Sequence, residues 1–295
     1  MSRGRDDDPT DRAGHADRAP DRPPDVRERE RQVPDDALTR DLNLPRDDER
    51  ERVECRGRAY SLNGTETRAL AAIGAFRVVP EDALVRGDGG AGLRSADLRH
   101  LADQGLVTQE TITDAGGARH VLTLTADGQA VLEAHQRPDA DGRQQAYSAG
   151  VVNARQLPHD VELYRVFREE ADRIEREGGR VRRVILDDEL KHDYQTFLHR
   201  DDRPVDADLH RDRQAFAEAN DLPVYRGHLE LPDLRIEYET DDGRLAHRDV
   251  ELVTEHYSRG QLAGKSHAGF VCYRAGRGRQ GGGTPFDPHH LERLV

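Results

Sequence analysis

The stretch LPDLRIEYETDDGRLAHRDVELVTEHY, residues 231–257, constrains the fold more than any other part of this chain. Two runs with alternating apolar residues flank the turn-forming sequence Asp-Asp-Gly, which predicts two antiparallel strands joined by a tight loop. One face of this hairpin is apolar apart from Arg248. That face needs a covering layer, and the helical segments around it predict a mixed α/β (α+β) domain.

The length of the loop decides which residues of the two strands face each other. A two-residue loop turns Glu251 to the face opposite that of Asp233. A three-residue loop, with Gly243 in the left-handed conformation, places Asp233 directly opposite Glu251 and Arg235 opposite Asp249. Both lengths are common in hairpins, so the sequence leaves the register open.

The three-residue register has a chemical consequence for the acidic residues. Two carboxylates directly opposite each other repel, so Asp233 and Glu251 would need a cation or a shared proton. Mg²⁺, which binds one or two carboxylates plus substrate phosphate, meets that need, with Glu162 on the first helix of the domain as a further candidate ligand. The alternative is that these acids form only the solvated face of a hairpin.

Composition divides the chain into five regions. The first residues are rich in Asp, Arg and Pro and poor in apolar residues, so we expect them to be disordered. The regions are a disordered charged tail (1–57), a first folded domain (58–137), a polar linker (138–150), a second folded domain (151–275) and a flexible Gly/Arg tail (276–295).

The sequence of the first domain predicts a helix, a short strand, two helices, a hairpin and a last helix, in that order. Asn63 and Glu66 have the spacing of a capping box at the start of its first helix. In LRSADLRHLADQGLV, Ser95 is expected to cap a helix that ends at Gly105. Two strands around a Gly-Gly turn follow, and a last helix is expected from Thr125.

This element order and the residues LRHLADQGLV…GGARHVLTLTADGQAVLEAH resemble the winged helix-turn-helix domains of MarR-type regulators. In those domains a Leu-Thr-x-x-Gly step starts the last helix, the recognition helix enters the major groove, and the wing contacts the DNA backbone. The resemblance implies double-stranded DNA as a partner. The candidate contacts are Arg94 and Arg119 for phosphate, with Ser95, Arg99 and His100 on the outer face of the helix.

The balance of charge leaves another role open for this first domain. Residues 58–137 hold eight Arg against ten Asp and Glu, so the domain is not basic. A winged helix that docks a protein is therefore the alternative to one that binds DNA.

The second domain opens with a His-led helix, HDVELY, and continues with a Pro-Asp strand, PDLRIEYE, and an acidic strand, DVELV. It resembles a degenerate PD-(D/E)XK nuclease core, and the two domains together resemble the replication-relaxation family of plasmids and mobile elements. The motif places a lysine two residues after its second acid, and this chain has none there. If the acid is Asp249, that position holds Glu251; if it is Glu251, the position holds Val253. Lys265 on the next helix is the candidate replacement, which gives a possible catalytic set of Asp233, Glu251 and Lys265.

Overall composition indicates which partners and which cellular compartment to expect for the protein. The net charge of −13 argues against bulk coating of nucleic acid, although a local basic face is sufficient for a binding site. Two distant cysteines indicate a reducing compartment, and no apolar run is long enough to cross a membrane. We therefore expect a cytoplasmic protein without a membrane partner.

These patterns lead to three alternative functions. The first is a DNA-binding protein of a mobile element that acts in plasmid-type replication, relaxation or mobilisation, with a relaxase or replication initiator as a possible partner. The second is a Mg²⁺-dependent DNA endonuclease or nickase, which the missing motif lysine leaves uncertain. The third is a MarR-like transcriptional regulator, whose second domain senses a signal or forms a homodimer.

Overall fold

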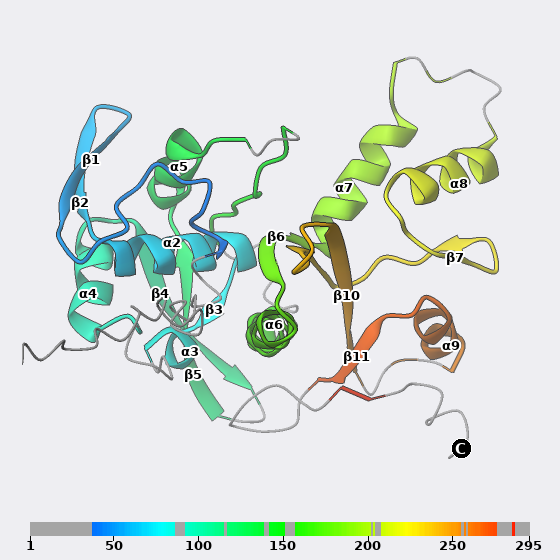
Figure 1. The fold of residues 1–295 in the computed structure, drawn as a ribbon. Coiled ribbons are helices and arrows are strands. Elements are labelled where there is room, and N and C mark those ends of the chain that lie inside the picture. Colours follow the sequence, from blue (N-terminus) through cyan, green and yellow to red (C-terminus); the bar gives the residue numbers. More distant parts are fainter. Residues whose placement is uncertain are drawn as a thin grey trace, which may run out of the picture. The chain divides into compact units, whose positions relative to one another are not determined.

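The computed structural model describes residues 37–85, 92–114, 117–138, 142–150, 157–201, 203, 208–254, 257, 259–275 and 285–286. They form an α+β fold in which helices accompany several separate sheets (Figure 1). All of them belong to one compact unit, Val33–Val295. Within these ranges, no helix combines the length and the apolar character that crossing a membrane requires.

The described chain begins with folded structure inside the segment that was expected to be disordered. Strands β1 (Glu51–Cys55) and β2 (Arg58–Leu62) form an antiparallel hairpin. The apolar residues before and within β1 are buried: Leu38, Leu42, Leu44 and Val53. Disorder over 1–57 therefore does not hold for residues 37–57, because their few apolar side chains all enter the core; residues 1–36 lie outside the described residues.

The next elements follow the order predicted for residues 58–137. They are α2 (Gly64–Phe76), β3 (Val79–Pro80), α3 (Glu81–Val85), α4 (Ser95–Asp103), β4 (Val107–Asp114), β5 (Gly117–Leu124) and α5 (Ala126–His135). The three strands form an antiparallel sheet in the order β3-β5-β4.

The helix ends show why these segments fold locally. The side chain of Asn63 accepts a hydrogen bond from the Glu66 backbone N–H, and the Glu66 carboxylate accepts one from the Asn63 N–H, which confirms the capping box. Gly105, at φ +73°, follows the end of α4. The prediction of Ser95 as a cap is wrong, since Arg94 is the N-cap residue and Ser95 is the first residue of the helix.

The second half of the chain is built on a four-stranded sheet. Its elements are α6 (Leu157–Arg176), β6 (Arg180–Leu186), α7 (Asp187–Leu198), α8 (Leu209–Ala219), β7 (Val224–Tyr225), β8 (His228–Leu229), β9 (Leu234–Glu239), β10 (Leu245–Val253), α9 (Arg259–His267) and β11 (Val271–Arg274). The strand order is β11-β10-β9-β6; β9 is antiparallel to both neighbours, and β11 is parallel to β10 with α9 as the crossover.

The segment between β6 and β9 has a small apolar cluster of its own. It is centred on Phe216, Ala217 and Leu222, with partly buried side chains of α7, β7 and β8 against it. This insertion, residues 187–231, adds a hairpin and two helices beside the sheet.

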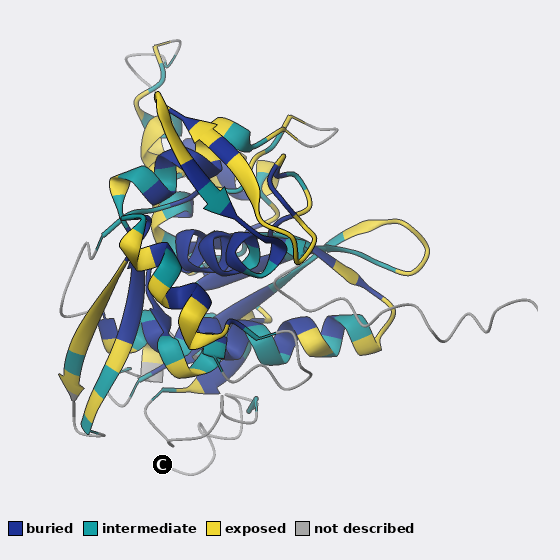
Figure 2. Cartoon of the chain, turned by 90° about the vertical axis from the view of Figure 1, so that its left-hand side faces the viewer, coloured by how far each residue is buried: buried dark blue, intermediate teal, exposed yellow. Residues whose placement is uncertain are grey.

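One hydrophobic core connects the two halves of the chain. The ring of Phe76 in α2 lies 5.2 Å from the ring of Tyr164 and 4.8 Å from that of Phe167, both in α6. Buried residues, dark blue in Figure 2, gather between the helices and sheets. Helix α6 therefore contacts both halves through its apolar side.

The segments predicted as linker and tail also make contacts. In the linker, Tyr147 is buried, and the Ser148 N–H donates to the Gly74 carbonyl at 2.9 Å. In the tail, the Phe286 N–H donates to the Cys272 carbonyl at 2.9 Å. The rest of the tail, 276–284 and 287–295, lies outside the described residues.

Candidate active site

The β9–β10 hairpin has the three-residue register. Strand pairing aligns Arg235 with Asp249, and the Thr240 N–H donates to the Arg244 carbonyl at 2.8 Å, which leaves three residues in the loop. Gly243 has φ +80°, the left-handed conformation that this loop requires. Of the two loop lengths that the sequence allows, the structure has the three-residue one.

This register brings the two candidate acids together. The Asp233 N–H donates to Glu251 Oε2 at 3.3 Å, and Asp233 Oδ2 accepts from the Leu252 N–H at 2.8 Å. Asp233 lies just before β9, while Glu251 lies in β10 and is almost completely buried. One carboxylate from the start of the hairpin and one from β10 thus share one site.

Lys265 reaches the same site from α9. Its Nζ lies 3.2 Å from Glu251 Oε1 and 3.7 Å from Glu230 Oε2, and it donates to the Leu231 carbonyl at 2.6 Å. The side chain is 13% exposed, so its charge is held in place and little screened by solvent. The predicted set of Asp233, Glu251 and Lys265 is therefore assembled.

Two further residues complete the surroundings of the acids. The Tyr257 hydroxyl donates to Glu251 Oε1 at 2.6 Å, and His159 Nε2 lies 3.2 Å from Asp233 Oδ2. Neither residue is among the site residues predicted from the sequence. His159 had a signal in the His-led helix HDVELY, but Tyr257 had none, because its position depends on the chain path after β10.

Burial and charge shift the protonation of these groups. Burial and the negative charge of Asp233 raise the pKa of Glu251 to about 7, although Lys265 and Tyr257 lower it in part. Burial lowers the pKa of His159, but hydrogen bonds to Asp160 and Asp233 and the charges of these acids outweigh it and raise the value to about 10. The site thus favours the protonated form of His159 beside Asp233, and it favours the neutral form of Glu251 more than water does.

The site opens into a pocket of about 590 Å³. Asp233, Glu251, Tyr257 and Lys265 line one part of it. Residues of the insertion line another part: Asp187, Lys191, Tyr225, Arg226 and His228. The volume is within the range of pockets that hold small molecules.

Glu162, the third candidate metal ligand, has other partners. Its Oε1 lies 3.6 Å from Arg119 Nη1 and 3.4 Å from Arg165 Nη1. In the part of the chain that the structure describes, no three His, Cys, Asp or Glu side chains are arranged to hold a metal ion. The candidate metal site thus consists of two carboxylates, Asp233 and Glu251.

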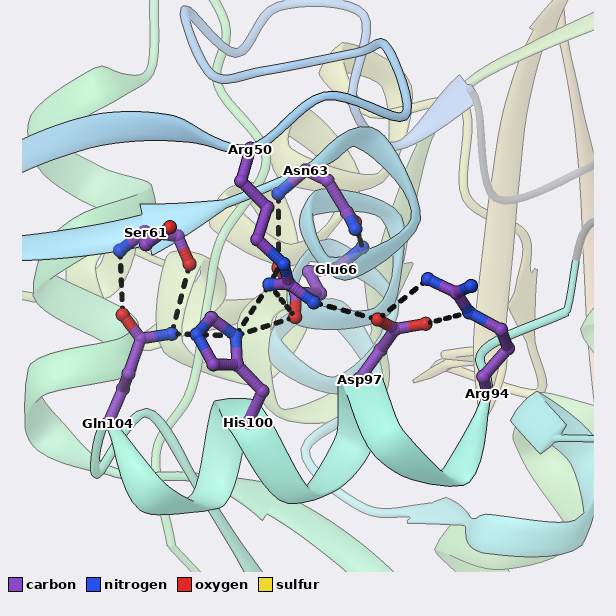
Figure 3. A network of polar contacts seen from close by, with 8 residues as sticks. All are labelled: Arg50, Ser61, Asn63, Glu66, Arg94, Asp97, His100 and Gln104. Carbon is purple, nitrogen blue, oxygen red and sulfur yellow. Dashed lines mark hydrogen bonds and ion pairs between the residues drawn. The ribbon is translucent and has the colours of Figure 1, made fainter.

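Two of the candidate DNA contacts belong to a network of polar side chains, shown in Figure 3. Arg94 Nε donates to Asp97 Oδ2 at 2.7 Å, and His100 Nδ1 lies 2.8 Å from Glu66 Oε1. Arg50, from the segment before β1, contacts both acids at 2.6 and 2.8 Å. The network links α4 to α2, so the half-buried side chain of His100 is turned toward Glu66.

The other candidates divide between the surface and a contact with α6. Ser95 and Arg99 are exposed on the outer face of α4. Arg119 in β5 is half-buried and lies beside Glu162 of α6. Arg94, Ser95 and Arg99 are thus the candidates that face outward.

No protein-family model, curated protein or solved structure matches this chain.

Proposed function

We propose that this chain binds DNA and hydrolyses a phosphodiester bond at the pocket around Asp233, Glu251 and Lys265. The observation that carries the proposal is the meeting of two carboxylates and one ammonium group from three separate elements. Lys265 takes the place of the missing motif lysine, since the position of its charge matters more than its position in the sequence.

The element order of the second half supports a PD-(D/E)XK-like core. A helix, α6, precedes strand β6, and the acid-bearing strands β9 and β10 are followed by helix α9 and the parallel strand β11. The resemblance implies the same order, with residues 187–231 as an insertion. This agreement favours the nuclease proposal over a hairpin with only a solvated face.

The donor set is suited to Mg²⁺. Asp233 and Glu251 offer hard oxygen ligands, and a cation between them would offset the repulsion of two neighbouring carboxylates. One or two carboxylates are enough, because substrate phosphate and water supply the other ligands. When bound, the ion would polarise a phosphate oxygen and favour ionisation of a water molecule.

The side chains divide the remaining work. Asp233 and Glu251 would hold the ion, and the attacking water would release its proton to solvent as its oxygen forms the new bond to phosphorus. The bond to the leaving oxygen breaks, and that oxygen takes a proton from solvent. The ammonium of Lys265 stabilises the negative charge that develops on phosphate, while His159 orients Asp233.

The first half would provide affinity for duplex DNA as a winged helix. Helix α4 would face the major groove with Ser95 and Arg99, and Arg94 would reach a phosphate. The proposed setting is a mobile element, in which such a protein acts in plasmid-type replication, relaxation or mobilisation.

A second candidate is a protein that binds DNA without cutting it, including a MarR-like regulator. The observation that favours it is that Lys265 and His159 already balance the charges of Glu251 and Asp233 without a metal ion. In such a protein the polar cluster would serve stability alone.

Incubation of supercoiled plasmid with the protein, with and without Mg²⁺ or Mn²⁺, tests the proposal. We expect metal-dependent nicking that is lost in Asp233→Asn, Glu251→Gln and Lys265→Met. Asp241→Asn, in the exposed β9–β10 loop, is the control and should nick normally. Retarded migration of duplex DNA without nicking at any metal concentration would overturn the nuclease proposal and favour the second candidate.

A further inference from the structure

The insertion places an arginine at the mouth of the candidate active site. Arg226 lies in the two-residue turn of the β7–β8 hairpin, lines the pocket and is exposed. Its guanidinium carbon lies 5.1 Å from the centroid of the Tyr225 ring. The ring of His267 also contacts Tyr225, with the ring centroids 4.9 Å apart, so Tyr225 supports the turn that carries Arg226.

Arg226 differs from the lysines of the pocket, Lys191 and Lys265, because they form ion pairs with carboxylates that line it. The carboxylates that line the pocket each have a cationic partner: Asp187 with Lys191, Glu230 and Glu251 with Lys265, and Asp233 with His159. Among the described residues, no carboxylate lies within ion-pair distance of Arg226. Its positive charge is therefore available to an anion that enters the pocket.

The size of the pocket limits what can enter it. A volume of about 590 Å³ is that of a small-molecule site. A DNA duplex, whose major groove alone is about 12 Å wide, cannot enter such a space, whereas one nucleotide of a single strand can.

We infer that the pocket takes a single strand of DNA, with a phosphate next to the cleavage point held by Arg226. This inference rests on the proposed function, because it names the form of DNA on which the site acts. Duplex DNA bound elsewhere on the protein would then have to present a displaced or unpaired strand to Asp233 and Glu251.

A second turn in the same chain provides a matched control. The β1–β2 hairpin also turns through an Arg-Gly pair, with φ +50° at Arg56 and +76° at Gly57, against +49° at Arg226 and +79° at Gly227. Arg56 is exposed and does not line the pocket. Backbone strain is thus common to both turns, and only the position of Arg226 points to a ligand.

Glycine is the best substitution for Arg226, because it removes the guanidinium and readily adopts the left-handed conformation found at this position. Binding is measured by fluorescence anisotropy with a labelled single-stranded oligonucleotide in EDTA, at several salt concentrations. We expect Arg226→Gly to raise Kd about tenfold and to lower the slope of log K against log salt by about 0.7. Arg56→Gly should change neither, and unlabelled duplex should compete poorly at the pocket.

The outcomes separate this inference from the nuclease proposal. Equal binding by Arg226→Gly and the unchanged protein would overturn the inference, as would an equal loss in Arg56→Gly or effective competition by duplex. Asp241→Asn, tested in the same metal-free assay, should bind the single strand as the unchanged protein does. If the unchanged protein never nicks plasmid but Arg226→Gly weakens its binding of the single strand, the strand-binding inference stands and the nuclease proposal fails.

Discussion

At the scale of single residues, charge pairs decide much of this structure. The chain is rich in Asp, Glu and Arg, and many of these side chains meet inside the molecule. Arg235 and Asp249 are the clearest case, with Nε and Oδ1 2.7 Å apart and both side chains under 10% exposed. Removing one partner of such a pair strongly destabilises a protein, because the other charge is then left buried without a counterion.

Asp249→Ala should therefore destabilise the protein strongly. We expect the free energy of unfolding to fall by about 3–5 kcal/mol, because Arg235 would lose its counterion in a buried position. Urea unfolding followed by circular dichroism gives the value. Arg52→Ala removes an exposed pair with Glu54 and should cost less than about 1 kcal/mol, so equal losses in both variants would contradict this reasoning.

Glu189 should make stability depend on pH. Burial raises its pKa from 4.5 to about 7, partly offset by Arg183 and increased by neighbouring acids. The folded state therefore holds a proton that the unfolded state releases, so this contribution to stability is present below about pH 4.5 and is lost as pH rises through about 7.

In Glu189→Gln the side chain stays neutral at every pH. Relative to the unchanged protein, this variant should gain about 1–3 kcal/mol of stability between about pH 5 and pH 8. Urea unfolding at the two pH values measures the difference. A gap between the two proteins that stays constant with pH would show that Glu189 titrates normally.

At the scale of elements, two backbone segments that lie very close together explain why glycine stands at a position that hydrophobic periodicity does not explain. Gly128 is the glycine of the Leu-Thr-x-x-Gly step at the start of α5. A Cβ atom there would lie 2.2 Å from the Leu106 carbonyl oxygen. Thr125 caps the same helix by accepting a hydrogen bond from the Gly128 N–H at 3.0 Å. The step thus joins α5 tightly to the chain that leads into β4.

Gly128→Ala should move α5 away from Leu106. We expect a loss of about 1–3 kcal/mol in unfolding free energy, as for other overpacked sites, and a lower Tm in calorimetry. Gly260→Ala in α9 is the control, because nothing lies within 4 Å of its added Cβ and alanine favours a helix. A Gly128→Ala variant as stable as Gly260→Ala would argue against the close approach.

At the scale of the whole molecule, α6 joins the two halves. Its Tyr164 and Phe167 contact Phe76 of α2, while Arg165 contacts Asp82 of α3 at 3.1 Å. Arg77, directly after α2, lies 2.9 Å from Asp188 at the start of α7. A change in the first half therefore has physical routes to the pocket.

The shared core predicts that both halves unfold together. Tyr164→Ala should lower the free energy of unfolding by about 3–5 kcal/mol, since its buried ring contacts both Phe76 and Phe167. Near-ultraviolet and far-ultraviolet circular dichroism should give one coincident urea transition in both proteins. Two separate transitions in the unchanged protein would show that the halves fold independently.

The sequence by itself determined the local structure. The capping box of Asn63 and Glu66, the order of elements from α2 to α5 and the left-handed Gly243 all follow from short-range patterns, because backbone sterics and neighbouring hydrogen bonds determine them. It also named the acid pair and Lys265, but it left the loop length open.

Only the tertiary structure decided which distant side chains meet. It selected the register that joins Asp233 to Glu251, added His159 and Tyr257, and turned His100 from the outer face of α4 into the network of Glu66. Such contacts join residues far apart in the chain, and they depend on how whole elements pack. Periodicity within one element carries no information about that packing, which is why the pocket and its Arg226 could not be predicted from the sequence.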